Sequence, residues 1–146
     1  MTERARIVAE ARRWIGTPYR HQASLIGVGC DCLGLVRGVW RAVIGPEPAV
    51  LPPYTPDWAE ASGQETLADA ARTHLIEIDP QMAAAGDIVL FRWRGGLPAK
   101  HCAVLSAADR MIHAHDGAAV AEVALGAWWR RRMAFAFTFP AAPETR

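Results

Sequence analysis

The period of the hydrophobic pattern changes at Gly86, and this change constrains the fold more than any other feature of the sequence. Before Gly86, apolar residues recur every three to four positions, as they do in amphipathic helices. After it, short apolar runs and alternating segments are typical of β-strands. This order predicts an α+β fold, with N-terminal helices packed on an antiparallel β-sheet, rather than a parallel doubly wound fold.

Three helices are predicted in the first half of the chain. The first covers residues 7–15 and ends before a Gly and a Pro. The second begins after Asp31, a candidate N-cap, and its apolar face continues to Val43. Five prolines between residues 46 and 58 predict a constrained loop. A shorter third helix is expected from the capping-box pattern of Ser62–Glu65.

Strand patterns follow in the second half. The predicted strands are Asp87–Phe91, Lys100–Leu105, Arg110–His115, Val120–Val123 and Met133–Phe139. We expect these strands to form an antiparallel meander. The alternation in the last strand predicts that Met133, Phe135, Phe137 and Phe139 share one face.

Length and composition limit the classes of protein to consider. The 146 residues predict a single domain over 1–146, with its core at about 4–139 and a frayed tail at 140–146. The net charge of +1 gives no electrostatic reason for nucleic-acid binding. We find neither a secretory signal nor a run of about 20 apolar residues, so we expect a chain made in the cytoplasm without membrane insertion.

The cysteine content argues against a disulfide framework. Cys30, Cys32 and Cys102 are too few and odd in number, so a reduced chain is expected. The C-x-C spacing with isolated histidines differs from that of zinc sites, so neither a metal nor another cofactor is predicted. Cys102 alternates away from His101 and is interpreted as core packing, and the role of Cys30 is left open.

Cys32 is the candidate nucleophile. With Asp31 as N-cap, it would lie in the first turn of the second helix, where the helix dipole and backbone N–H groups favour a thiolate. The same N–H groups can bind the oxyanion of a tetrahedral intermediate. A free cysteine is more often a small buried apolar residue, so this position alone does not decide the function.

Two histidines on neighbouring strands strengthen the catalytic interpretation. If Leu105 pairs with Asp109, His101 lies directly opposite His113, and both imidazoles project from one face. One ring could then act as base toward a thiol while the other fixes its tautomer. His115 shares the face of His113 by alternation and competes with it for the third role.

The sequence resembles the NlpC/P60 family of cell-wall cysteine peptidases. The matching blocks, in the family's order, are Trp14–Tyr19, Asp31–Val36, Gly86–Phe91, His101–Leu105 and Ile112–Ala114. The second block is similar to the family's D-C-S-G-L-V nucleophile motif, and the fourth to its H-V-G-I-Y strand. Each block alone is weak evidence, but the five together are specific, and they extend over most of the chain.

This resemblance implies a reduced papain-like core and a set of residue roles. It implies that Cys32 is the nucleophile, that His101 is the general base and that His113 orients the base. By the same resemblance, Tyr19 lies near the nucleophile and contributes to the oxyanion or substrate site, and Asp31 contacts the amino end of the substrate peptide. The implied reaction is hydrolysis of peptidoglycan stem or cross peptides through a thioacyl-enzyme.

Some positions depart from the family pattern. Leu33 replaces the serine after the nucleophile, and Arg20–Gln22 replaces the W-G-G that follows the tyrosine. The segments Pro18–Ala23 and Gly29–Gly34 look most like the phage-type subgroup, which is encoded in tail modules of phages and of phage-derived gene-transfer particles. This likeness implies tail proteins as partners and incorporation into a phage-like particle.

Two other functions remain open on the sequence. The chain could be a catalytically silent tail component that keeps the core for docking, with Arg130–Arg132 beside Trp128 and Trp129 as the contact. It could also be an amidase or acyl transferase that uses the same thiolate on a non-wall substrate. The bond that is cleaved is not indicated by the sequence.

Overall fold

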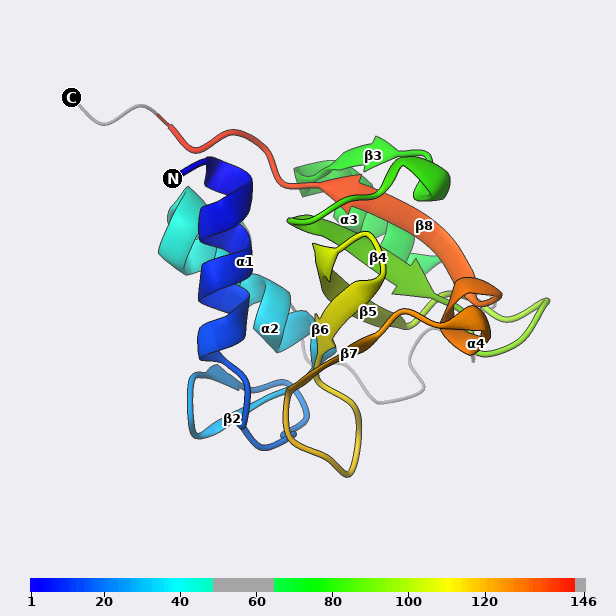
Figure 1. The fold of residues 1–146 in the computed structure, drawn as a ribbon, viewed down its shortest axis with the longest axis horizontal. Helices are drawn as coiled ribbons and strands as arrows, with labels where there is room; N and C mark the ends of the chain where they lie inside the picture. The colour runs from blue at the N-terminus through cyan, green and yellow to red at the C-terminus, as the bar shows by residue number, and fades with distance from the viewer. Residues whose placement is uncertain (49–64, 144–146) are drawn as a thin grey trace.

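The computed structural model describes residues 1–48 and 65–143 (Figure 1). The helical elements are α1 (Glu3–Arg13), α2 (Cys32–Val39), a π-helix η1 (Trp40–Ile44), α3 (Thr66–His74), a 3-10 helix η2 (Pro80–Met82) and α4 (Ala127–Arg130). The strands are β1 (Ser24–Leu25), β2 (Gly29–Cys30), β3 (Ile76–Ile78), β4 (Asp87–Phe91), β5 (His101–Ala107), β6 (Arg110–His113), β7 (Ala121–Ala124) and β8 (Met133–Thr138). None of the helices in this part of the chain has the length and apolar character needed to cross a membrane.

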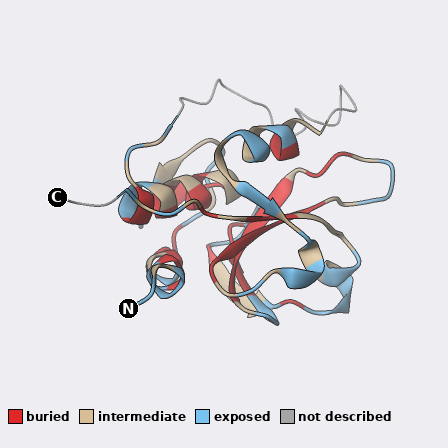
Figure 2. Cartoon of the chain, turned by 90° about the horizontal axis from the view of Figure 1, so that it is seen from above, coloured by how far each residue is buried: buried red, intermediate tan, exposed pale blue. Residues whose placement is uncertain are grey.

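Helices α1 and α2 pack closely because a glycine lies at their contact. The side chain of Thr2 caps α1, whose buried residues lie on one side and whose exposed residues lie on the other (Figure 2). Trp14 follows this helix and is 3% exposed. A Cβ atom built on Gly38 would lie 2.0 Å from the Trp14 ring, so only glycine allows this approach.

The predicted second helix begins where expected. Asp31 is its N-cap, and its carboxylate accepts a hydrogen bond from the N–H of Gly34. The helix continues as the π-helix η1 and ends at Gly45. A Cβ atom on Gly34 would lie 1.9 Å from the carbonyl oxygen of Ala23, so the loop before α2 crosses directly over this position.

The main sheet is antiparallel, with strand order β3-β8-β4-β5-β6-β7. The α+β prediction is therefore confirmed. Strands β4 to β7 form the expected meander, but β8 returns to the other side of β4, and the edge strand β3 was not predicted. All five residues of β4 are buried because the sheet is covered on both faces. Ile88 packs toward α1, α2 and α3, whereas Val89 packs toward Leu125 and Trp129.

The prediction that Met133 shares a face of β8 with Phe135 and Phe137 is wrong. The register between β4 and β8 shifts between Leu90 and Phe91, so Leu90 pairs with Phe135 and Phe91 pairs with Met133. The extra residue turns Met133 toward the apolar cluster on the opposite face from Phe135 and Phe137. Strict alternation cannot anticipate such a bulge.

The predicted pairing of Leu105 with Asp109 is also wrong. Leu105 pairs with Met111, and after a bulge Ala107 pairs with Arg110 across a tight turn. Because the offset from the prediction is two residues, every side chain keeps its face. His101 and His113 therefore still share a face, although they are not directly opposite.

The predicted start of the third helix also requires correction. Helix α3 begins at Thr66, so Glu65 precedes the first turn, while the other capping-box residues lie outside the described part of the chain. Most of the proline-rich segment 46–58 also lies outside it. In the segment predicted as a tail, the N–H of Ala142 donates to the Glu3 carboxylate.

Candidate active site

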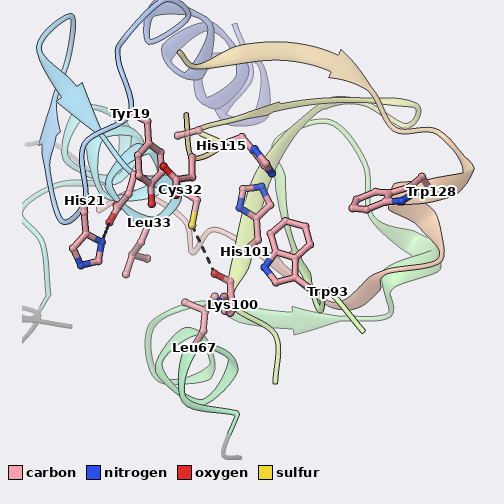
Figure 3. A pocket seen from close by; sticks show the side chains of 13 residues that line it. Tyr19, His21, Cys32, Leu33, Leu67, Trp93, Lys100, His101, His115 and Trp128 are labelled. Atoms are coloured by element: carbon pink, nitrogen blue, oxygen red, sulfur yellow. Dashed lines mark hydrogen bonds and ion pairs between the residues drawn. The ribbon is translucent and has the colours of Figure 1, made fainter. Parts of the chain in front are cut away.

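A cleft of about 440 Å³ lies between the start of α2 and the ends of strands β4, β5 and β6 (Figure 3). It is lined by Tyr19, His21, Asp31, Cys32, Leu33, Leu67, Trp93, Lys100, His101, Ala114, His115, Asp116 and Trp128. The cleft thus brings together Cys32 and His101 from segments far apart in the sequence.

Cys32 is the first residue of α2, so its side chain lies where the helix dipole favours an anion. Its Sγ atom lies 4.0 Å from the carbonyl oxygen of Lys100, the residue before β5. The Cys102 thiol and the His101 imidazole hold the pKa of Cys32 well below its usual value, against burial and the Asp31 carboxylate, which raise it. The sulfur is therefore set up to be a thiolate.

The proximity of Cys102 to Cys32 was not predicted. Cys102 does alternate away from His101 and packs in the core, as expected. However, the neighbouring Cys32 sulfur, together with burial, raises the pKa of Cys102 well above its usual value. Cys102 therefore stays a thiol that supports the neighbouring anion. Cys30 is fully buried, and burial raises its pKa to about 12.

The two predicted histidines are in contact. His101 Nε2 lies 3.0 Å from His113 Nδ1, while the His115 ring lies 5.6 Å from that of His101, centroid to centroid. Burial, with the neighbouring His101 and His115, lowers the pKa of His113 to about 3. A neutral His113 can accept the proton of His101 Nε2, which leaves Nδ1 of His101 available to a thiol.

Tyr19 lies on the opposite side of Cys32 from His101 and His115 (Figure 3), and Asp31 also lines the cleft. Burial, with the charges of Cys32 and Asp31, raises the pKa of Tyr19 to about 12, so its hydroxyl remains a donor at neutral pH. Asp31 is 2% exposed, and its two oxygens accept from the N–H groups of Gly34 and Gln22, each at 2.7 Å. The carboxylate therefore caps α2 and fixes the loop that carries His21.

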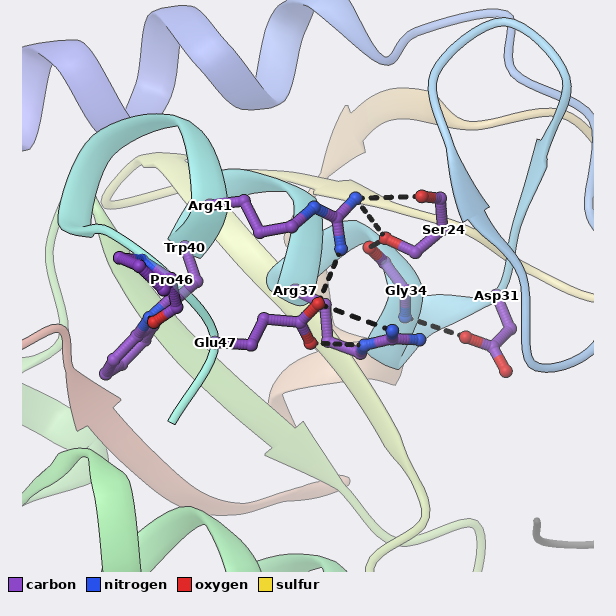
Figure 4. A network of polar contacts seen from close by, with 8 residues as sticks. All are labelled: Ser24, Asp31, Gly34, Arg37, Trp40, Arg41, Pro46 and Glu47. Carbon is purple, nitrogen blue, oxygen red and sulfur yellow. Dashed lines mark hydrogen bonds and ion pairs between the residues drawn. The ribbon is translucent and has the colours of Figure 1, made fainter. Parts of the chain in front are cut away.

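A network of polar contacts holds this loop against α2 (Figure 4). The Ser24 hydroxyl donates to the carbonyl of Gly34 at 2.6 Å, and the Arg41 guanidinium donates to both the carbonyl and the hydroxyl oxygen of Ser24. Arg37 and Arg41 both pair with Glu47. These contacts fix the beginning of α2, and with it the position of Cys32, relative to the Tyr19 side of the cleft.

Trp93 is not among the predicted site residues, and Trp128 is predicted only as a docking residue. Trp93 stacks on His101 with ring centroids 5.2 Å apart and an interplanar angle of 24°. Trp129 lies edge-on to His113 at 5.2 Å. A signal was available, since Trp93 stands between two arginines and ahead of two glycines, a context untypical of a core residue.

The arginines of the suggested docking segment are partly engaged within the chain. Arg130 donates to the carbonyls of Leu125 and Ala108, and Arg132 donates to that of Trp128. Arg131 is exposed. Within residues 1–48 and 65–143, no group of three or more His, Cys, Asp or Glu side chains could hold a metal ion.

Solved structures define the class to which this fold belongs. The NlpC/P60 domain of the peptidoglycan hydrolase SagA is 24% identical, with coverage of 95% of this chain and 100% of that one and a TM-score of 0.66. A Staphylococcus aureus protein, similar to a lipoprotein of the NLP/P60 family, is 22% identical (94% and 41% coverage, TM-score 0.64). A Bacillus cereus NlpC/P60 family protein is 17% identical (95% and 40% coverage, TM-score 0.67). The fold is that of NlpC/P60 proteins.

The chain itself belongs to the family described as a domain of unknown function, DUF6950, whose model matches residues 4–131. No curated protein matches the sequence significantly. The chain spans only about two-fifths of the Staphylococcus aureus and Bacillus cereus proteins, at 41% and 40% of their lengths.

Proposed function

We propose that this chain is a cysteine peptidase that hydrolyses amide bonds in the peptide part of peptidoglycan. The observation that carries the proposal is the arrangement of three side chains. Cys32 begins a helix in a cleft, its pKa is lowered partly by His101, and Nε2 of His101 lies 3.0 Å from His113. A thiol, a base and a group that orients the base are the requirements of thiol acyl transfer.

In the first step His101 takes the Cys32 proton, and the sulfur attacks the amide carbonyl. Collapse of the tetrahedral intermediate breaks the C–N bond, and the proton on His101 passes to the leaving amine. His113, neutral near pH 7, accepts the Nε2 hydrogen of the His101 imidazolium. It thereby keeps Nδ1 of His101 directed at the reacting atoms.

In the second step water attacks the thioester, His101 receives the water proton, and Cys32 leaves as a thiolate. Both steps pass through an oxyanion. The backbone N–H of Cys32, at the helix N-terminus, and the Tyr19 hydroxyl are the donors that we assign to it. Asp31 supports the site by capping α2. Both of its carboxylate oxygens already accept backbone hydrogen bonds, which makes it less available for the contact with the amino end of a substrate that the resemblance implies.

The substrate class is supported by the fold. SagA, which shares this fold at 24% identity, is a peptidoglycan hydrolase. The chemistry of the cleft is compatible with a peptide, because it is open and combines polar and aromatic lining residues.

The test is mass spectrometry of Gram-negative peptidoglycan fragments after incubation with the wild-type chain and with Cys32→Ala. New peptide termini that appear only with the wild type are expected, and they identify the bond. If a folded wild type with a free Cys32 thiol produces none, the proposal fails. The catalytically silent docking function would then be favoured, or acyl transfer to a non-wall substrate if non-wall amides react.

The setting that we propose is a phage-like tail, in which the enzyme opens the wall locally. Its support is the likeness of Pro18–Ala23 and Gly29–Gly34 to the phage-type subgroup. Proteomic analysis of purified phage-like particles from the source organism tests this setting. The chain should co-purify with tail proteins at a fixed ratio, and its absence from the particles would refute the tail assignment while leaving the peptidase proposal intact.

A further inference from the structure

The imidazole ring of His101 lies among aromatic rings that are roughly parallel to it. Trp93 stacks on it, with ring centroids 5.2 Å apart and an interplanar angle of 24°. The rings of Trp129 and Phe91 are inclined to it by 31° and 32°, with centroids 5.7 Å and 6.0 Å away. Of these three rings, that of Trp93 lines the cleft beside His101 (Figure 3). The acyl-transfer steps use none of them, so their position around the base requires an explanation.

The loop that carries Trp93 is held in place by Glu65. This carboxylate accepts from the Arg92 guanidinium at 2.8 Å and from the N–H of Ala99 at 3.0 Å, so it joins the two ends of the β4–β5 loop. The indole is therefore ordered on the His101 ring without help from a ligand. An interaction with a group ordered in this way costs little conformational entropy.

The proposed reaction turns His101 into a cation for part of each cycle. In a triad with an acidic third residue, a carboxylate offsets this charge. The third residue here is His113, and burial, with the neighbouring His101 and His115, lowers its pKa to about 3, so it is neutral near pH 7. Within residues 1–48 and 65–143, no carboxylate forms an ion pair with His101. The Cys32 thiolate offsets the charge only until the sulfur attacks, so the imidazolium needs stabilisation from groups of another kind.

An indole face is suited to this task. Its π electrons make the face negative, and among aromatic side chains tryptophan attracts a cation over its face most strongly. The attraction increases where the cation is withdrawn from water, and His101 is 5% exposed. Because the charge of an imidazolium is spread over the ring, the stacked arrangement brings that charge to the face of Trp93.

We propose that Trp93 is a positioning residue that acts through His101, and that its indole face stabilises the imidazolium relative to the neutral imidazole. The effect on Cys32 is indirect. The proton that leaves its sulfur stays on His101 until the leaving amine takes it. A stabilised imidazolium therefore favours the ion pair of thiolate and imidazolium over the neutral thiol and imidazole. This inference rests on the proposed peptidase function, which makes His101 the base.

Other titratable and charged groups also surround His101, and all of them remain when Trp93 is replaced. His113 and His115 meet its ring at 77°. Further groups of this kind line the cleft: Tyr19, His21, Asp31, Cys32, Lys100 and Asp116. Arg92 and Arg94 flank Trp93 in its loop. A change in titration that follows replacement of Trp93 alone is therefore assigned to the indole.

The stabilisation can be measured without catalysis in Cys32→Ala, in which no thiolate pairs with the imidazolium. The ring C–H signals of His101 in NMR spectra, identified by their loss in His101→Asn, report its protonation across a pH series. Adding Trp93→Leu removes the π face and should lower the proton affinity of His101 about tenfold, a shift of about 1 pH unit. Adding Trp93→Phe, which keeps a smaller π face, should lower it about threefold. If Trp93→Leu does not fold, the phenylalanine variant decides.

Trp128→Leu is the matched control in the same background. Trp128 lines the same cleft, and among the described aromatic rings it contacts those of Trp93 and Trp129 but not that of His101. Its replacement should leave the proton affinity of His101 unchanged. An unchanged affinity in both Trp93 variants, or an equal fall in Trp128→Leu, would overturn the proposal.

A second readout is the pH profile of kcat/KM with Cys32 intact. The alkaline limb reports loss of the imidazolium proton, so in Trp93→Leu it should move to lower pH by about 1 unit. The acidic limb should stay in place, because the imidazolium is present on both sides of the Cys32 ionisation. A role of Trp93 in structure alone would lower kcat/KM at every pH and leave both limbs in place, which would contradict the proposal.

The NMR titration and the hydrolysis assay fail independently. If the wild type cleaves no peptidoglycan but the proton affinity of His101 depends on Trp93, the peptidase proposal is wrong and the stabilisation of the imidazolium stands. If the wild type cleaves wall peptides but the proton affinity is the same without Trp93, the peptidase proposal stands and the role of Trp93 is wrong.

Discussion

The Nε2 atom of His101 lies 3.0 Å from the Nδ1 atom of His113, and His113 is 7% exposed. His101 is also buried, at 5% exposed, but it lines the cleft, whereas His113 is not among the lining residues. The Trp129 ring packs against the His113 ring in a T-shaped arrangement, with ring centroids 5.2 Å apart. A hydrogen bond shielded from water in this way can hold the proposed base, His101, in one tautomer throughout the proposed acyl transfer.

His113→Ala should therefore lower kcat/KM of peptide hydrolysis by roughly 100-fold or more, the scale seen when the orienting group of a catalytic histidine is lost. His113→Asn should recover much of the loss, because the amide oxygen can accept the Nε2 hydrogen of His101. The measurement is steady-state kinetics on a muropeptide across a pH series.

His115→Ala is the matched control for this prediction. His115 lines the cleft but shows no hydrogen bond to His101, and its ring lies 5.6 Å away. We expect a loss of less than about tenfold, as for a residue that contacts substrate without orienting the base. A larger loss at His115 than at His113 would reverse the assignment of the third residue.

The low pKa of His113 predicts acid sensitivity of the folded state. Its pKa is about 3 in the folded protein, against 6.5 for an unperturbed histidine, so between these values the unfolded chain binds more protons. The contribution of neutral His113 to stability is complete above pH 6.5 and is lost as the pH falls toward 3. Urea unfolding at about pH 7 and about pH 4 measures the difference, which should shrink in His113→Asn. An unchanged pH dependence in that variant would contradict the prediction.

The sequence sufficed for features that depend on local chemistry. Asp31 was identified as the cap of α2 because a carboxylate before an apolar helical pattern satisfies the first N–H groups. The change of period at Gly86 predicted the α+β class because burial of one face sets the side-chain period of each element. Cys32 and His101 follow from those two elements, and the structure brings both into one cleft.

Features that depend on docking between distant segments were not predictable in the same way. The β5–β6 register follows from a tight turn and a bulge near Ser106, and neither has a distinct residue signature there. The adjacency of Cys32 and Cys102 requires knowledge of how α2 sits on β5. Trp93 and Trp128 line the same cleft from the β4–β5 loop and from α4, so no single segment of sequence contains both.

Cys102 should control the reactivity of Cys32 even though it is not part of the proposed acyl transfer. The Cys102 thiol is the largest influence that lowers the pKa of Cys32, ahead of His101. Cys102→Ala should therefore raise the pKa of Cys32 and reduce the rate of its alkylation by iodoacetamide near neutral pH. Cys102→Ser, which retains a hydroxyl donor, should shift the pH–rate profile less.

Cys30→Ala is the control for the alkylation experiment, because Cys30 is fully buried and its pKa is raised to about 12. Its removal should leave both the number of reactive thiols and the profile unchanged. If Cys32 in Cys102→Ala is alkylated with the same pH–rate profile as in the wild type, then Cys102 does not lower the pKa of Cys32, and His101 and the helix terminus alone do so.

The last prediction concerns Gly34, two residues after the proposed nucleophile Cys32. A Cβ atom on Gly34 would lie 1.9 Å from the carbonyl oxygen of Ala23, so Gly34→Ala must displace the loop that Asp31 and Ser24 attach to α2. We expect the free energy of unfolding to fall by about 1–3 kcal/mol, the cost of overpacking a close contact. Gly95→Ala, at a position with nothing within 4 Å, should be nearly neutral in the same urea titration. Because the displaced loop lies between Tyr19 and Cys32, Gly34→Ala should also lower kcat in the fraction that remains folded. A stable Gly34→Ala protein with wild-type kcat would show that the loop can move without disturbing the site.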